Sequence, residues 1–119
     1  MNITKSIFKA YDIRGIYEKE LTDKSVELVA KALSSIYKEN NDKIVVGRDG
    51  RLSSIPLSKA VIKGFLDSGK DVIDIGEVPT PLMYFAVKKF KINSGVMVTG
   101  SHNPKQYNGL KIIMDGHAL

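Results

Sequence analysis

The 119-residue sequence predicts a single α/β domain, a three-layer sandwich around a mostly parallel, mixed sheet. Short β-branched runs that end in glycine recur at residues 43–47, 71–76 and 94–100, as expected of buried strands. Helical stripes of apolar residues separate these runs. Strands that alternate with helices in this way wind into a parallel sheet with right-handed crossovers.

The spacing of apolar residues predicts two helices in the first half of the chain. The first follows Thr22, a candidate N-cap, and carries an apolar stripe from Val26 to Tyr37. The second spans residues 57–65 and should end near Gly69, because glycine commonly closes a helix.

A third helix is predicted to run to Phe90 from Thr80 and Pro81, which suit the N-cap and the first helical position. We expect its large apolar side chains, from Met83 to Phe85 and at Phe90, to pack in the core.

Each end of the chain adds one predicted strand. Residues 13–17 suit an edge strand, and residues 110–114 suit a strand that follows an Asn108-Gly109 turn. Alternation along the second strand would place Lys111 and Ile113 on one face and the even-numbered apolar residues on the other.

Composition excludes several kinds of site. The chain has no cysteine, which removes disulfides, thiolate metal sites and cysteine nucleophiles and fits a reducing cytoplasm. No apolar stretch approaches the ~20 residues of a membrane helix, and the first residues do not form a secretory signal. We therefore expect a cytoplasmic protein without a membrane partner.

The net charge of +5 favours an anionic ligand. The lysines are scattered, the longest basic run is Lys88-Lys89, and aromatic residues do not interleave with basic ones as on a single-strand-binding surface. We expect a small anionic ligand and no nucleic acid. A non-enzymatic domain that binds anions or nucleic acid is the alternative from a different functional class.

Polar loops follow three predicted strands, at residues 48–54, 77–80 and 100–109, and ligands gather at such strand ends in α/β sheets. In the third loop Gly100 lets the backbone turn and Pro104 prevents a regular helix, so Ser101 is held at the edge of the sheet.

A serine hydroxyl reacts near neutral pH only with a base, an oxyanion-type cradle or a phosphate already attached. His102 is adjacent to Ser101 in the sequence, which is poor geometry for a Ser–His relay. Lys111 would lie near Ser101 if the loop folds back, where an ammonium could stabilise a phosphate. A polar turn loop with a solvated edge lysine is the structural alternative.

The loop at residues 48–54 carries two arginines, whose forked guanidinium groups could hold phosphate oxygens. The alternative is that Asp49 pairs with Arg51 and braces the loop, which we favour for these two residues. Both interpretations stay open for Arg48.

Five sequence blocks, taken together and in order, resemble the first domain of the α-D-phosphohexomutases, most closely the phosphomannomutase/phosphoglucomutase branch. They are FKAYDIRG, VGRDGRLS, GEVPTP, TGSHNP and YNGLK, at residues 8–15, 46–53, 76–81, 99–104 and 107–111. The resemblance covers nearly the whole chain. It implies that residues 1–119 are the N-terminal, nucleophile-bearing domain of a larger four-domain enzyme.

The resemblance also implies a reaction. Members of this family move a phosphate between the 1- and 6-positions of a hexose phosphate through a bisphosphorylated intermediate, and a hexose 1,6-bisphosphate acts as activator. The serine that carries the phosphate corresponds to Ser101, and its phosphate contributes to a Mg²⁺ site. Lys111 and Arg14 would neutralise charge or assist proton transfer, Tyr11 and Arg14 would lie near the substrate, and His102 with Asn103 would shape the nucleophile loop.

Two departures limit what the resemblance implies. The acidic D-G-D-G-D-R loop that holds Mg²⁺ in the family has no counterpart in this sequence, and the family's sugar-phosphate loops of the third and fourth domains are also missing. We therefore expect negligible mutase turnover from this chain alone, and its partners would be the hexose phosphate and the remaining domains.

The phosphoglucosamine mutase branch is the closest rival. Its opening block usually resembles G-T-D-G-I-R-G and its serine loop S-A-S-H-N-P, whereas this chain has residues 11–15 as YDIRG and Gly100 before the serine. These differences favour the phosphomannomutase/phosphoglucomutase branch.

Overall fold

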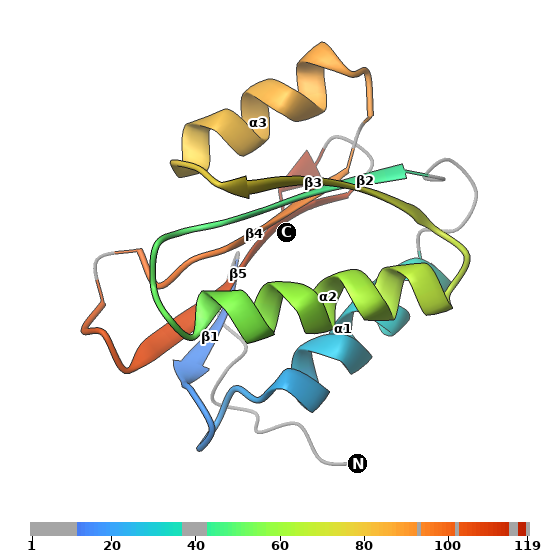
Figure 1. The fold of residues 1–119 in the computed structure, drawn as a ribbon. Coiled ribbons are helices and arrows are strands. Elements are labelled where there is room, and N and C mark those ends of the chain that lie inside the picture. Colours follow the sequence, from blue (N-terminus) through green and yellow to red (C-terminus); the bar gives the residue numbers. More distant parts are fainter. Residues whose placement is uncertain (1–11, 37–42, 93, 102, 115–116, 119) are drawn as a thin grey trace.

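The computed structural model describes residues 12–36, 43–92, 94–101, 103–114 and 117–118. Its strands form one mixed sheet in the order β1-β5-β4-β2-β3, with the short β6 paired to β5 (Figure 1). β4, β2 and β3 run parallel to one another, and β5 lies antiparallel to both β1 and β4. The bounds are β1 Asp12–Ile16, β2 Lys43–Arg48, β3 Asp71–Glu77, β4 Gly95–Val98, β5 Tyr107–Met114 and β6 His117–Ala118.

Within the described residues, three helices cover the two faces of the sheet, so the predicted three-layer α/β sandwich is confirmed (Figure 1). Helices α1 and α2 lie side by side on one face, and α3 lies on the other. Their bounds are α1 Asp23–Ile36, α2 Ser54–Asp67 and α3 Thr80–Lys89.

The apolar core has two parts, one on each side of the sheet. On the side of α1 and α2, Phe65 and Val61 pack with strand residues such as Val98 and Leu110. On the side of α3, Met83 packs with Met97 and neighbouring apolar side chains. Leu110 therefore faces α1 and α2, as its predicted alternation with Lys111 requires.

Thr22 caps α1 as predicted. Its Oγ1 accepts a hydrogen bond from the Ser25 N–H at 3.0 Å, and Ser25 Oγ accepts one from the Thr22 N–H at 2.9 Å. The start of α3 differs by one residue, because Pro79 is the N-cap and Thr80 is already helical. Pro79 has an extended ψ of 149°, as the residue before a helix needs, and its own side chain makes no capping bond.

Two other local predictions were wrong. Asn108 and Gly109 lie inside β5 rather than in a turn before it. Of the large apolar residues in and directly after α3 that were predicted to be core, only Met83 is buried, whereas Tyr84, Phe85 and Phe90 are 39%, 59% and 51% exposed. One apolar stripe is enough to cover the short parallel strands, so the rest of this helix faces outward.

None of the helices in the described part of the chain is both long and apolar enough to cross a membrane.

Candidate functional site

The candidate site lies where β2 and β4 end. These strands run parallel with Arg48 opposite Val98, so the loops that follow them leave the same edge of the sheet. The Asp49 N–H donates to the Val98 carbonyl at 2.9 Å and extends the pairing into the first loop. The loop after β2 and the loop after β4, at residues 99–106, are therefore built side by side.

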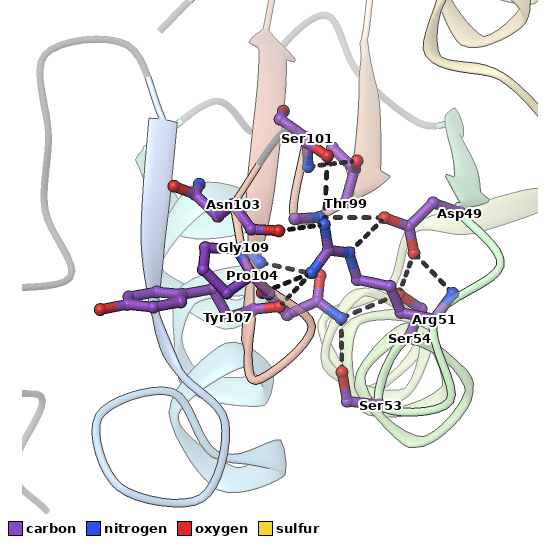
Figure 2. Close-up of polar contacts among 12 residues, drawn as sticks. Asp49, Arg51, Ser53, Ser54, Thr99, Ser101, Asn103, Pro104, Tyr107 and Gly109 are labelled. Atoms are coloured by element: carbon purple, nitrogen blue, oxygen red, sulfur yellow. Dashed lines mark hydrogen bonds and ion pairs between the residues drawn. The ribbon is translucent and has the colours of Figure 1, made fainter.

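The guanidinium group of Arg51 bridges the two loops. Arg51 comes from the first loop, and its terminal nitrogens donate to three backbone carbonyls of the second loop and to the carbonyl of Tyr107, where β5 begins (Figure 2). Nη1 donates to Pro104 O at 2.7 Å and to Tyr107 O at 3.1 Å. Nη2 donates to Ser101 O at 3.1 Å and to Asn103 O at 2.7 Å.

Asp49 holds the other side of this guanidinium group. Its Oδ2 lies 3.3 Å from Arg51 Nε and accepts the Gly100 N–H at 2.9 Å, while Oδ1 accepts the Arg51 N–H at 3.0 Å and the Ser54 hydroxyl. Burial alone would raise the pKa of Asp49, but the hydrogen bonds from Ser54, Gly100 and Arg51 outweigh it and lower the pKa below its ordinary value. The carboxyl is therefore a charged brace, and the predicted pairing of Asp49 with Arg51 is confirmed.

Ser101 has an uncommon backbone conformation and an exposed side chain. Its φ of 52° lies in the left-handed region, which costs a non-glycine residue about 1–2 kcal/mol. Its N–H donates to Thr99 Oγ1 at 3.0 Å, and its carbonyl oxygen accepts from Arg51. The hydroxyl is thus presented to solvent from a backbone that is fixed on both sides.

Gly100 serves this loop in a way the sequence did not indicate. The chain does turn there, since the Asn103 N–H donates to Gly100 O at 3.0 Å, but the φ of Gly100 is not in the left-handed region, so the turn itself does not require glycine. A Cβ at position 100 would lie 2.3 Å from Arg51 Cζ. The missing side chain is what lets the guanidinium group enter the loop.

The start of β5 anchors the far end of the loop. Asn108 is fully buried, and its Nδ2 donates to the hydroxyls of Ser53 and Ser54, each at 2.8 Å. At Gly109 a Cβ would lie 2.3 Å from Ile13 O, so β1 approaches closely there. These contacts explain why the Asn-Gly pair belongs to a strand rather than a turn.

Arg14 and Lys111 lie on one face of the sheet, near this loop. Arg14 of β1 pairs with Gly109 of β5, and Lys111 lies two residues further along β5, where it pairs with Asp12 and Met97. Paired residues, and residues two apart on one strand, share a face of the sheet, so Arg14 and Lys111 are neighbours on the same face. The Thr99 N–H donates to Gly109 O at 2.9 Å, and Gly109 is the residue that pairs with Arg14. Arg14 is therefore level with the end of β4, where the chain continues to Ser101. The face is that of α3, since Met97 packs against this helix.

Two of the other predicted site residues, Asn103 and Arg48, lie within the described part of the chain. Asn103 is half-buried and contributes backbone groups, because its N–H donates to Gly100 O at 3.0 Å and its carbonyl accepts from Arg51. Tyr11 and His102 lie outside the described residues. Arg48 ends β2, opposite Glu77 of β3.

The described residues do not form a metal site of their own, because no three carboxylate or imidazole side chains among them cluster closely enough to hold an ion. Asp49, the carboxylate nearest to the loop of Ser101, already accepts from Ser54, Gly100 and Arg51. The described residues by themselves therefore do not fit the predicted Mg²⁺.

Together, the sandwich and its braced polar loops define an α/β domain with a candidate ligand site at the carboxyl edge of its sheet. The family model for phosphoglucomutase/phosphomannomutase, alpha/beta/alpha domain I, matches residues 5–119. The chain therefore belongs to the phosphoglucomutase/phosphomannomutase family and corresponds to its domain I.

Individual relatives agree with this assignment. The chain is 48% identical over 119 residues to a phosphoglucomutase of Neisseria meningitidis serogroup B and 47% identical over 115 residues to a phosphomannomutase/phosphoglucomutase of Pseudomonas aeruginosa. It is 45% identical over 108 residues to a phosphoglucosamine mutase of Prochlorococcus marinus. These matches cover 99%, 96% and 91% of the chain, but it spans only 26%, 25% and 24% of the relatives, about a quarter of their length.

A solved structure shows the same fold. The crystal structure of a phosphoglucomutase/phosphomannomutase family protein from Burkholderia thailandensis superposes with a TM-score of 0.91 at 42% sequence identity. The match covers 99% of this chain and 28% of that one.

Proposed function

We propose that this chain is the nucleophile-bearing domain of a phosphohexomutase and that Ser101 carries the phosphoryl group. The substrate is a hexose phosphate, interconverted between its 1- and 6-phosphates. The observation that carries the proposal is the presentation of Ser101, an exposed hydroxyl on a braced, left-handed backbone at the carboxyl edge of the sheet. Support also comes from relatives named phosphoglucomutase and phosphomannomutase/phosphoglucomutase.

The proposed step is a direct phosphoryl transfer. A hydroxyl oxygen of the sugar phosphate forms a bond to phosphorus while the bond from phosphorus to Ser101 Oγ breaks, and the proton of that hydroxyl passes to Oγ. The product is a sugar bisphosphate and a free serine. After the sugar reorients, the reverse step returns its other phosphate to Ser101, so phosphate and protons balance over the cycle.

Charge neutralisation is the main task of the side chains around such a transfer, because the transition state spreads negative charge over the phosphoryl oxygens. A phosphoserine itself carries about −1.5 to −2 charges at pH 7. Arg14 and Lys111 are suited to this task, since both are cationic and occupy neighbouring rows of one sheet face.

Several parts of the proposal concern residues beyond this chain. Mg²⁺ would bind the Ser101 phosphate only with acidic ligands that this sequence lacks. Sugar selectivity and turnover would likewise need the remaining domains of a longer protein, and the isolated chain would be inactive. A hexose 1,6-bisphosphate would act as activator, by phosphorylating Ser101.

Loss of the nucleophile tests the proposal. In the natural protein that contains this chain, Ser101→Ala should reduce mutase kcat at least ~10³-fold, since the covalent route is removed. Ser35→Ala is the matched control, because Ser35 is an exposed serine on α1 and should leave kcat unchanged. A Ser101→Ala protein that keeps most of its activity contradicts the proposal.

The second candidate is a phosphoglucosamine mutase, favoured by the 45% identity to the Prochlorococcus marinus relative. The two differ in the sugar that they turn over. Comparing kcat/KM for mannose 1-, glucose 1- and glucosamine 1-phosphate in the natural protein distinguishes them. We expect the first two sugars to be preferred.

A further inference from the structure

We infer that Arg51 is a positioning residue for this reaction, which fixes the backbone of Ser101 and does not bind the sugar phosphate. The expected effect of Arg51 on catalysis rests on the proposed function. Its role in holding the loop rests only on the hydrogen bonds and the ion pair that Arg51 makes.

The guanidinium group has no donor to spare. An arginine side chain has five N–H donors. Here the four on Nη1 and Nη2 have four backbone carbonyls as acceptors, and Nε faces Asp49 Oδ2 at 3.3 Å. The Arg51 side chain is only 18% exposed. A phosphate could bind it only by displacing the loop.

The four carbonyls belong to a segment that closes around the guanidinium group. Three come from Ser101, Asn103 and Pro104 in the loop, and the fourth comes from Tyr107 at the start of β5 (Figure 2). Carbonyl oxygens that converge on one point repel one another unless a cation lies between them. Arg51 is thus the centre on which the loop folds.

This arrangement explains how Ser101 keeps a φ of 52°. A left-handed serine persists only where its surroundings hold it there. The Ser101 carbonyl is held by Arg51 Nη2, and the preceding Gly100 gives the guanidinium group its space. Without Arg51 the peptide after Ser101 can rotate, and the hydroxyl loses its fixed direction.

A lysine cannot replace this group. Its ammonium has three donors around one point and lacks the planar fork that reaches four separate carbonyls. Arg51→Lys should therefore keep the charge and lose the positioning. A residue that served only as a cation near the phosphate would tolerate this change better.

The test combines hydrogen exchange and kinetics in the natural protein that contains this chain. The variants are Arg51→Lys and Arg51→Ala, and Lys89→Ala is the control because it removes one exposed positive charge at the end of α3, away from the loop. Amide exchange is followed by NMR at Asn103 and Tyr107, whose N–H groups bond to Gly100 O and Pro104 O within the loop. Steady-state kcat and KM are measured with a hexose 1-phosphate.

For both Arg51 variants we expect loop amide exchange to rise at least ~10-fold. We expect kcat to fall ~10²-fold because the nucleophile is misplaced, with KM within about threefold of wild type because ground-state binding is retained. Added guanidinium ion should restore part of the kcat and part of the amide protection to Arg51→Ala, and neither to Arg51→Lys. This rescue shows that the Ala variant is folded.

If the amides of Asn103 and Tyr107 exchange at the wild-type rate in a folded Arg51→Ala protein, the inference is overturned, whatever the mutase activity. A raised KM with unchanged kcat also overturns it, because Arg51 would then bind substrate. Absence of mutase activity in the wild-type protein would instead contradict the proposed function, and the exchange data would still decide whether Arg51 holds the loop.

Discussion

The nucleophile loop depends on how closely Arg51 approaches the backbone at position 100. A Cβ at Gly100 would lie 2.3, 2.4 and 2.6 Å from three atoms of the guanidinium group. These atoms cannot retreat without breaking bonds to the loop or to Asp49, since every donor is engaged. Because Gly100 has no side chain, Arg51 can reach the loop and hold the backbone of Ser101.

Gly100→Ala should lower the free energy of unfolding by about 1–3 kcal/mol, the usual cost of overpacking. It should also shift the NMR signals of Ser101 and Asn103, because Arg51 has to move. Urea unfolding and a ¹H–¹⁵N spectrum measure the two effects.

Gly69→Ala is the matched control for this change. Gly69 has a φ of 87°, and no atom lies within 4 Å of the place that a Cβ would take, so alanine there costs about 1–2 kcal/mol of backbone strain without touching the loop. If Gly100→Ala leaves the loop signals in place, as Gly69→Ala should, the account of the loop is wrong.

The lowered pKa of Asp49 makes the stability of the domain depend on pH. Its pKa is lowered in the folded state, against about 3.9 in the unfolded chain, so its contribution is fully present above that value and is lost as the pH falls through the folded pKa. The difference in free energy of unfolding between wild type and Asp49→Asn should therefore be largest near pH 7 and shrink below about pH 4. Urea titrations at several pH values measure it, and a constant difference would show that the carboxylate is not a charged brace.

The contact between α1 and α2 depends on a second missing side chain. Gly64 lies in α2, where a Cβ would be 2.5 Å from the Glu27 carbonyl oxygen and 2.7 Å from Ala30 Cβ. The main chain of one helix thus packs directly against the other. Both helices must keep this spacing to cover the sheet together.

Gly64→Ala should destabilise the domain by about 1–3 kcal/mol, because overpacking exceeds the gain of up to about 1 kcal/mol that alanine brings to a helix. Lys59→Ala, an exposed change in the same helix, should stay within about 0.5 kcal/mol of wild type. Thermal and urea unfolding measure both variants. A Gly64→Ala protein more stable than wild type would mean that the helices separate freely.

Most elements could be predicted because their signals are local. Thr22 before an apolar stripe fixes the start of α1, and the β-branched runs mark the central strands. Asn108-Gly109 misled because the pair is typical of turns. Its place in β5 depends on Ser53 and Ser54, more than fifty residues away in the sequence, and on the approach of β1 to Gly109.

The site could be predicted only in part, for the same reason. The loop positions and the pairing of Asp49 with Arg51 follow from short-range patterns. The bonds of Arg51 to carbonyls of the second loop and of Tyr107 span 50 to 56 positions of sequence, and no local pattern reports them. The exposure of Tyr84 and Phe85 in α3 could not be predicted either, because it depends on how much of the sheet this one helix covers.

The molecule as a whole carries a net charge of +5 without a basic tract. Part of the positive charge is internally paired, since Lys31 and Lys63 lie 3.1 and 3.7 Å from Glu27. We therefore expect no tight binding to a mixed-sequence oligonucleotide even in dilute salt. Fluorescence anisotropy measures this, and tight binding that weakens steeply with salt would favour the nucleic-acid-binding alternative.

In the proposed reaction, Ser101 accepts and returns a phosphoryl group. The most direct test incubates the natural protein that contains this chain with glucose 1,6-bisphosphate and locates the added phosphate by peptide mass spectrometry. We expect one phosphate on Ser101, lost on addition of excess hexose phosphate and absent from Ser101→Ala. A protein that turns over hexose phosphates with its phosphate on another residue, or with none, would contradict it.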